Sequence, residues 1–308
     1  MADTVFRMGS RASRLALAQA REAQTALCTE MDVPKSSVPI IPISTKGDRV
    51  QDRPFRQIGG KGVFCRDLEL ALLDRTIDIA VHSLKDMPVQ QPSGLIIDCV
   101  LRRSDPRDAL ISRTATCVAE IGRNDSVGTS SVRRQAQLRR IQPQLKIVEL
   151  RGNIDTRIEK WDRGDAAHLI LAMAGLKRLA VDHVPIHPIP VTEMLPAPGQ
   201  GIICLERRCS DRTLADAFSR LNDRNTALMA AAERHFLAGL GGSCELPVGA
   251  LALIEGECIE LTGEHYPRSD SWRVSGMIAD SFDNAKTAGR TLARRLIHGA
   301  GRAPVDRP

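Results

Sequence analysis

The chain has 308 residues, of which 43% are hydrophobic and 26% are charged, a composition typical of packed globular proteins and unlike disordered or collagen-like ones. One ordinary hydrophobic core holds fewer residues than this, so two or three domains of about 100 to 150 residues are expected. No apolar run approaches the roughly 20 residues that cross a bilayer, and the first residues lack the pattern of a secretory signal. We therefore expect a cytoplasmic protein without a membrane span.

The charge balance is basic, with 43 Lys and Arg residues against 37 Asp and Glu residues. This excess favours an anionic partner. Aromatic residues make up only 3% of the chain, too few for the stacking surfaces that bind single-stranded bases, and no zinc-finger or RNA-recognition signature is present. We expect an anionic small molecule rather than a nucleic acid, and a monomer, because no unusually apolar stretch indicates a protein partner.

The eight cysteines are scattered along the chain, and none forms a C-x-x-C pair. In a cytoplasmic protein such cysteines are kept as thiols. The seven histidines show no metal-ligand spacing such as His-Glu-x-x-His. The sequence predicts neither disulfides nor a metal site.

The first hundred residues alternate between helical and strand-like patterns. A helix is predicted over 13–28, where Ala16, Ala20, Ala23 and Leu27 recur at helical spacing, and a strand over 38–45 follows it. A second helix over 63–74 and a second strand over 77–82 come next. This alternation predicts a mostly parallel sheet that is covered on both faces.

A second unit of the same kind follows the charged, proline-containing segment 102–107, which we interpret as a crossing between domains. Its predicted elements are a strand ending at 126–128, a helix over 134–140, a strand over 146–150, a helix over 155–161 and a strand over 167–172. The proline-rich segment 185–198 is interpreted as a second linker. A weak similarity between 9–14 and 128–133, with hydroxyls and arginines ahead of a helix, suggests that the two units are built alike.

The pattern changes after residue 222. A helix over 226–238, a glycine-rich turn, short strands between 247 and 275, and a last helix over 285–298 predict a smaller α+β domain. The fold class is therefore α/β, with two similar α/β domains flanking a cleft and a smaller C-terminal α+β domain. The predicted domains are 1–103 with 200–220, 104–199, and 221–308.

Polar residues crowd into the turn after the apolar strand that ends in segment 81–88, where Ser83, Lys85 and Asp86 lie. Ligands of α/β sheets bind beyond the carboxyl ends of such strands. The alternative is an ordinary polar loop in which Asp86 caps the turn before Pro88. Spacing alone leaves both interpretations open.

Two further segments combine hydroxyls, glycine and arginine at the junction of a strand and a helix. Segment 129–134 brings Thr129, Ser131 and two arginines to a predicted helix N-terminus, where backbone N–H groups and the helix dipole attract anions. Segment 150–157 has arginines on either side of a glycine that permits close backbone approach. Both are candidate carboxylate or phosphate sites. The alternative for the first is a capped helix with solvent-facing arginines.

Two glycine-rich segments complete the set of candidates. Segment 59–64 contains Lys61 but lacks the spacing of a phosphate-binding loop, so we interpret it as a basic loop that closes over a charged ligand. Segment 239–247 carries Cys244 beside three glycines, which leave its sulfur accessible as a nucleophile or attachment point. The alternative for Cys244 is a small buried hydrophobic residue.

Taken together, these segments resemble the porphobilinogen deaminase family over most of the chain. The similar stretches are 10–13 with 15–16 and 19, 45–48, 59–64, 78–88, 105–108, 128–138, 150–157, 174–179, 195–201 and 242–247. The resemblance implies three domains, the first two built like a periplasmic binding protein with a cofactor between them. It also implies that porphobilinogen loses ammonia to give an azafulvene, which the free α-carbon of a growing pyrrole chain attacks. Four additions give a hexapyrrole, and water releases the linear tetrapyrrole.

The resemblance assigns roles to individual residues. Cys244 carries a dipyrromethane cofactor through a thioether, and Asp86 is the catalytic acid–base residue beneath the pyrrole nitrogens. The further cofactor-binding residues are Ser83, Lys85, Thr129, Ser131, Arg133, Arg134, Arg151, Gly152 and Gln200. The substrate-binding residues are Arg11, Ser13, Gln19, Lys61, Arg157 and Arg178. Arginine suits this purpose because each pyrrole carries two carboxylates, which a guanidinium holds with two hydrogen bonds.

The sequence departs from the family pattern at two positions. Gln57 stands where some members carry a basic residue, and Ser243 replaces a glycine that some members have immediately before the cysteine. Two other functions use similar features: a two-lobed binding protein for an anionic small molecule, which needs no tethering cysteine, and a nucleic-acid binder, whose affinity would fall steeply with salt.

Overall fold

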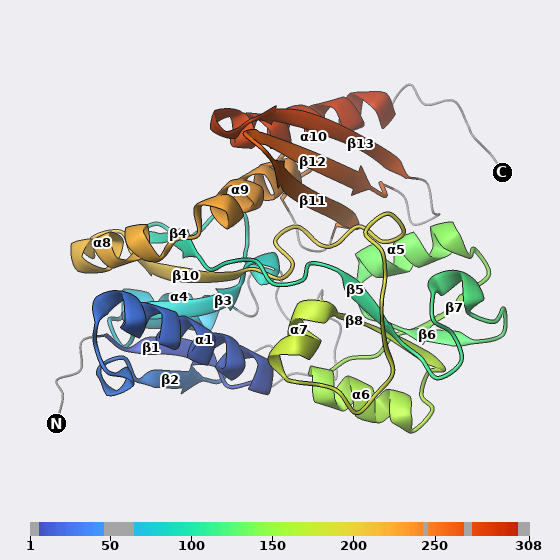
Figure 1. The fold of residues 1–308 in the computed structure, drawn as a ribbon, viewed down its shortest axis with the longest axis horizontal. Helices are drawn as coiled ribbons and strands as arrows, with labels where there is room; N and C mark the ends of the chain where they lie inside the picture. Colours follow the sequence, from blue (N-terminus) through green and yellow to red (C-terminus); the bar gives the residue numbers. More distant parts are fainter. Residues whose placement is uncertain (1–5, 46–64, 243–245, 268–272, 301–308) are drawn as a thin grey trace.

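The structure is a computed structural model that describes residues 6–45, 65–242, 246–267 and 273–300. These residues form two five-stranded sheets and one three-stranded sheet, each with its own helices (Figure 1). Short 3₁₀ helices at Lys35–Ser37, Leu84–Asp86, Val118–Glu120 and Phe282–Asn284 lie in the connections. No helix in these ranges is long and apolar enough to span a membrane.

The first sheet contains strands from both ends of the first 210 residues. Its order is β2 (Ile40–Ile43), β1 (Met8–Arg11), β3 (Ile79–Ser83), β10 (Ile203–Arg208) and β4 (Leu95–Val100). β1 pairs in parallel with β2 and β3, whereas β10 is antiparallel to both of its neighbours. Four strands therefore run in one direction, which confirms the prediction of a mostly parallel sheet.

Helices cover both faces of this sheet because each has one apolar side. α1 (Arg14–Met31) begins after its N-cap Ser13, whose side chain accepts a hydrogen bond from the Ala16 backbone N–H. α1 and α8 (Arg212–Leu221) pack against the same core cluster, and α4 (Arg66–Leu73) covers the other face through Leu68 and Leu72.

The second sheet repeats this arrangement. Its order is β7 (Lys146–Val148), β6 (Ser126–Gly128), β8 (His168–Ala172), β5 (Asp108–Ile111) and β9 (Ile186–Pro188). β5 is the antiparallel strand, as β10 is in the first sheet. α6 (Ile154–Asp162) and α7 (Met173–Arg178) pack on one face, and α5 (Val132–Ile141) packs on the other. The predicted similarity of the two units is confirmed by this common strand order.

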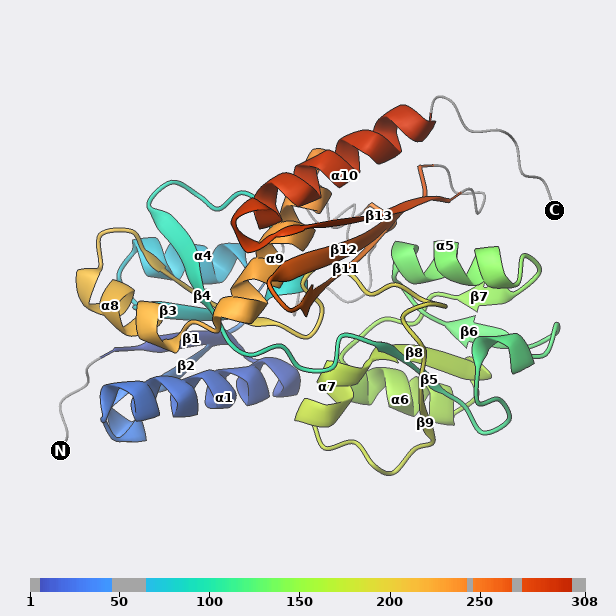
Figure 2. The ribbon, with the colours of Figure 1, turned by 45° about the horizontal axis from the view of Figure 1, so that its top comes forward.

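The third sheet is antiparallel and smaller. β11 (Val248–Glu255), β12 (Cys258–His265) and β13 (Val274–Ser281) pair in sequence order, and α9 (Arg224–Gly239) and α10 (Ala285–Ala300) share a core cluster with them. Figure 2 shows both helices on one side of the sheet. The α+β character predicted for this part of the chain is confirmed. The proposed domain boundaries assign one sheet to each domain.

Several details differ from the sequence predictions. β1, β4, β5, β10, α7 and α8 were not predicted. The strands and α7 are short, whereas α8 has a clear helical period in Leu214, Ala217 and Phe218 that sequence reasoning passed over. The segment 185–198 is more than a linker, since β9 within it adds an edge strand to β5. An edge position tolerates Pro188, because a proline lacks the N–H that a central strand needs. Residues 63–64 of the second predicted helix lie outside the described residues.

Two connections join the first two sheets. One runs from β4 to β5 through 101–107, and the other runs from β9 to β10 through 189–202. The carboxylate of Glu233 on α9 holds both, because it accepts hydrogen bonds from the Arg103 guanidinium at 2.6 Å and from the Gly199 backbone N–H at 2.7 Å. The third sheet is thereby tied to both connections.

Candidate functional site

A cavity of about 380 Å³ lies between the two five-stranded sheets. Its walls come from the segments that follow the carboxyl ends of β1, β3, β6, β7 and β8, and from residues 200–202 just before the antiparallel strand β10. An antiparallel strand begins at the edge where its parallel neighbours end. The cavity therefore occupies the position at which α/β sheets bind ligands.

Fourteen of the predicted site residues line this cavity. They are Arg11, Ser13, Gln19, Ser83, Lys85, Asp86, Ser131, Arg133, Arg134, Arg151, Gly152, Arg157, Arg178 and Gln200. Thr129 is buried behind the wall, where its hydroxyl accepts a hydrogen bond from the Ser131 backbone N–H at 3.2 Å, and Ser130 faces the cavity instead. Lys61, Gln57 and Cys244 lie outside the described residues.

The cavity wall is strongly basic. Among the described residues, eight cationic side chains belong to it, namely Arg11, Arg14, Lys85, Arg133, Arg134, Arg151, Arg157 and Arg178, and two carboxylates do, those of Asp86 and Asp155. Like charges held so close raise one another's energy unless anions enter among them. This donor set fits a ligand that carries several carboxylates.

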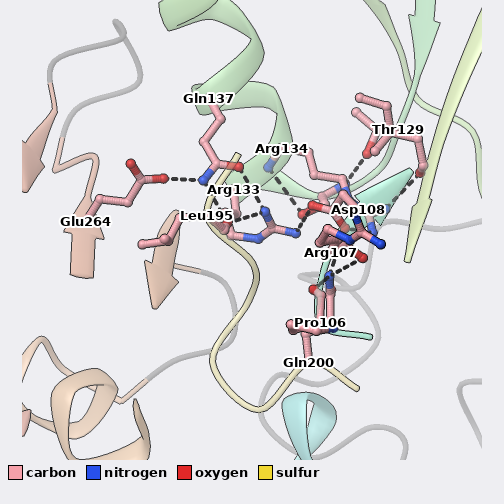
Figure 3. A network of polar contacts seen from close by, with 12 residues as sticks. Pro106, Arg107, Asp108, Thr129, Arg133, Arg134, Gln137, Leu195, Gln200 and Glu264 are labelled. Carbon is pink, nitrogen blue, oxygen red and sulfur yellow. Dashed lines mark hydrogen bonds and ion pairs between the residues drawn. The ribbon is translucent and has the colours of Figure 1, made fainter. Parts of the chain in front are cut away.

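Asp108, at the start of β5, organises two of these arginines (Figure 3). Its buried carboxylate accepts hydrogen bonds from Arg133 at 2.8 Å, from Arg134 at 2.7 Å and from the Gln200 side chain at 2.9 Å. Burial would raise the pKa of Asp108, but the two guanidiniums outweigh it and hold that pKa well below its usual range. Arg133 and Arg134 are thus fixed in direction by the protein itself.

Arg157 contrasts with this pair. None of its side-chain donors has a hydrogen-bond partner among the described residues, and its Nε is buried. Burial and the nearby Arg134 lower the pKa of Arg157 to about 10, while Asp86 partly opposes the shift. A buried guanidinium nitrogen without a hydrogen-bond partner is costly, so the place of Arg157 in the wall favours an anionic ligand.

Lys85 and Asp86 lie in the 3₁₀ turn Leu84–Asp86, directly after β3. Asp86 is exposed to the cavity, and burial lowers the pKa of the neighbouring Lys85. Ser83 is held by Gln19 of α1, whose side-chain N–H donates to the serine hydroxyl at 2.7 Å. The Asp86 carboxylate therefore faces a cavity whose described charged residues are mostly cations.

Gly152 adopts a backbone φ of +116°, which residues with side chains rarely adopt. A Cβ at this position would lie 2.9 Å from the Thr156 side chain. Glycine is therefore required here by the tight turn into α6, which brings the Gly152 backbone close to the Thr156 side chain.

The third sheet reaches the site from behind. The Gln137 side chain accepts a hydrogen bond from Arg133 at 2.8 Å and donates to the Leu195 carbonyl at 2.8 Å and to the Glu264 carboxylate of β12 (Figure 3). Asp108, Arg133, Gln137 and Glu264 form a continuous polar chain from the cavity to the third sheet.

Sequence reasoning missed three residues that shape the site, namely Asp108, Arg14 and Asp155. Asp108 precedes the apolar run 109–111, and a carboxylate at the start of such a strand needs a buried cation. That signal was available. Arg14 and Asp155 pair across the cavity, and their distance in the sequence gave no signal.

Comparison with known families shows what this site belongs to. Residues 6–216 match the family described as "Porphobilinogen deaminase, dipyromethane cofactor binding domain", and residues 227–298 match "Porphobilinogen deaminase, C-terminal domain". A porphobilinogen deaminase of Paracoccus denitrificans is 45% identical over 301 residues, covering 98% of this chain and 95% of that protein. One of Syntrophomonas wolfei is 41% identical over 298 residues, covering 97% of each.

Solved structures of low sequence identity are also similar. The VFT2 domain of BvgS from Bordetella pertussis matches with a TM-score of 0.42 and 13% identity, covering 70% of this chain and 85% of that one. An ancestral cationic amino acid solute binding protein matches with a TM-score of 0.41 and 15% identity, covering 70% and 87%.

The cavity and the matched family agree in their chemistry. A dipyrromethane with carboxylate side chains fits a wall in which eight cations face two carboxylates and in which Arg157 has a buried, unpartnered Nε. The match spans both parts of the family and nearly the whole chain. The chain belongs to the porphobilinogen deaminase family, the transferases of tetrapyrrole biosynthesis that polymerise porphobilinogen on a dipyrromethane cofactor.

Proposed function

We propose that this chain joins four porphobilinogen molecules head to tail into the linear tetrapyrrole hydroxymethylbilane, with release of ammonia, in the cavity between its two α/β domains. The observation that carries the proposal is one exposed carboxylate, Asp86, in a wall of eight cationic side chains. The cationic side chains suit a substrate with several carboxylates. The Asp86 carboxylate suits a reaction whose intermediates are positively charged. The product is an intermediate of haem biosynthesis.

The basic wall binds the carboxylates of the pyrroles. Arg11, Arg151, Arg157 and Arg178 present guanidiniums from both α/β domains, and Ser13, Ser131 and Lys85 add further donors. Arg133 and Arg134 each donate a hydrogen bond to Asp108. Their contribution to substrate binding is therefore chiefly the positive potential and the rigidity of the wall. Gln200 and Gly152 shape its surface.

Asp86 is the catalytic residue in this proposal. A carboxylate at this position accepts hydrogen bonds from pyrrole N–H groups and stabilises the positive charge that develops when ammonia leaves. Ser83 and Gln19 fix the end of β3, and with it the start of the turn that carries Asp86. The bound dipyrromethane supplies the free α-carbon to which the first substrate pyrrole is joined.

Cys244 is proposed as the thioether anchor of the dipyrromethane. Its described neighbour Gly242 packs near Val89, three residues after Asp86, since a Cβ on that glycine would lie 3.6 Å from the Val89 side chain. Gly241 and Gly242 both have positive φ values, 110° and 68°, and such turns bring backbone close to other groups. The described end of this turn thus lies beside the segment that follows Asp86.

Purified protein tests the proposal directly. We expect porphobilinogen consumption, a red colour with Ehrlich reagent from the bound dipyrrole, and an intact mass greater by one dipyrromethane. The Cys244→Ser variant should lack the colour and the added mass, whereas Cys258→Ser, which changes an exposed cysteine of β12, should keep both. An active wild-type protein of unmodified mass would overturn the assignment of Cys244.

The same preparation distinguishes the other functions considered for this sequence. A two-lobed binding protein would retain porphobilinogen without consuming it, and a nucleic-acid binder would show salt-dependent affinity for DNA or RNA. The proposal also includes a cytoplasmic monomer, with no membrane or nucleic-acid partner. Light scattering of the purified protein measures its oligomeric state, and fractionation of cells measures its location.

A further inference from the structure

One face of α1 carries two charged residues that reach across to the second α/β domain. Arg14 and Glu22 are eight residues apart, which places them on the same side of a helix. Arg14 Nη1 lies 2.7 Å from Asp155 Oδ1 on α6, and Glu22 Oε2 lies 2.9 Å from Arg178 Nε on α7. Figure 1 shows α1 directed at α7, and the two helices are in contact.

The two ion pairs differ in exposure. The Arg178 side chain is 8% exposed and is also held by the Gly201 carbonyl, whereas Arg14 is 67% exposed and Asp155 is 33% exposed. An exposed ion pair contributes little to stability and is easily exchanged for another partner. The Arg14–Asp155 pair is therefore the one that can open at little cost.

Asp155 is unexpected where it stands. In the part of the cavity wall that the structure describes, it is one of two carboxylates among eight cations, and it has no place in the acid–base chemistry assigned to Asp86. A negative charge at this point repels the carboxylates of the substrate unless it is neutralised. Arg14 neutralises it, and the helix dipole favours it in the first turn of α6.

We propose that Asp155 is a positioning residue that occupies the Arg14 guanidinium until a carboxylate of an incoming pyrrole replaces it. This inference rests on the proposed function, because it needs a polycarboxylate substrate. While the pair is formed, it joins the two α/β domains at the cavity. When a substrate carboxylate takes Asp155's place on Arg14, the total number of ion pairs is unchanged, so a pyrrole enters without leaving an unpaired guanidinium.

Two variants break the same ion pair from opposite sides. Asp155→Asn leaves Arg14 available and removes the repulsion, so the KM for porphobilinogen should fall about two- to fivefold, the range expected of an exposed ion pair. Arg14→Gln removes the guanidinium that donates to the substrate carboxylate, so KM should rise by a similar factor. In both variants kcat should change less than KM, and the differences should shrink at high salt.

A matched control removes an equivalent charge elsewhere. Asp165 also pairs with an exposed arginine, Arg163, at 3.4 Å, but neither residue lines the cavity. Asp165→Asn has the same change in net charge as Asp155→Asn and should leave KM unchanged. A fall in KM in this control would show a general charge effect and would overturn the proposal.

Thermal unfolding gives a readout that does not depend on activity. Both variants lose the same ion pair, so their melting temperatures should fall by the same small amount while their KM values move in opposite directions. If KM changes in the same direction in both, or in neither, the pair only joins the domains and the exchange is refuted. If the wild-type protein consumes no porphobilinogen, the proposed function itself fails, and the exchange fails with it.

Discussion

The Arg134 guanidinium lies 2.7 Å from the carboxylate of Asp108, and both side chains are almost completely removed from solvent. Asp108 pairs with Arg133 in the same way at 2.8 Å. One carboxylate thus compensates two buried cations in the cavity wall. The arrangement leaves net positive charge beside the cavity while fixing the direction of both guanidiniums.

We expect Asp108→Asn to destabilise the protein by about 3–5 kcal/mol, because it leaves two buried guanidiniums without their counter-charge. Urea unfolding measures this change. Asp162→Asn is the control, since Asp162 pairs with Arg113 on the surface, where a loss should stay within about 0.5 kcal/mol. Equal stability of the two variants would contradict the role given to Asp108.

The pH dependence of the free energy of unfolding should also reveal the ionisation of Asp108. Its pKa is lower in the folded protein than in the unfolded chain, so its stabilising contribution is complete above the unfolded value of about 3.9. The contribution is lost as the pH falls below that value towards the folded pKa. We expect the free energy of unfolding of the wild type to decline below about pH 4 more steeply than that of Asp108→Asn.

Asp86→Asn should abolish turnover and leave the fold intact. The substitution keeps the size and some hydrogen bonding of the side chain but removes the negative charge that stabilises cationic intermediates. Asp86 is exposed, so the melting temperature should stay close to that of the wild type. Near-normal product formation by this variant would exclude Asp86 as the catalytic residue.

Arg157→Gln should raise the KM for porphobilinogen by roughly tenfold or more, because it removes a hydrogen bond between two charged groups, whose free energy corresponds to about that factor. Arg157→Lys keeps the charge but loses the two-pronged geometry, so its KM should lie between those of the wild type and the glutamine variant. The comparison of these two variants separates charge from geometry. An unchanged KM in both would show that Arg157 does not bind the substrate.

Arg157 also predicts a pH effect. Its pKa is lowered to about 10, so its positive charge is present below that pH and is lost as the pH rises through it. We expect the KM of the wild type to rise as the pH approaches 10 and the KM of Arg157→Gln to rise less. Initial-rate measurements at several pH values test this difference.

Gly152→Ala should destabilise the protein by about 1–3 kcal/mol through its positive φ, and by more through the contact of the new Cβ with Thr156. Gly164→Ala is a matched control, because Gly164 also has a positive φ of 89° but has no atom within 4 Å of a new Cβ. The difference between the two variants measures the steric contact alone. Equal losses would show that backbone strain accounts for both.

The regular elements of this fold follow from local patterns. The helix predicted over 13–28 is observed as Arg14–Met31, and the one predicted over 155–161 is observed as Ile154–Asp162. Apolar spacing and N-capping residues such as Ser13 act within a few residues, so they can be recognised without knowledge of the fold. Short strands such as β5 and β10 were not predicted, because their pairing partners are distant in the sequence.

The sequence by itself determined the α/β character, the similarity of two units and most of the charged residues that line the cavity, through apolar periods, turn chemistry and resemblance to a family. Only the tertiary structure decided that Arg133 and Arg134 spend their donors on Asp108, that Thr129 lies behind the wall, and that Arg14 meets Asp155. These outcomes depend on tertiary contacts between distant segments. The packing of the two α/β domains against each other brings together charges separated by more than a hundred residues, as in the Arg14–Asp155 pair, and no local pattern records that distance.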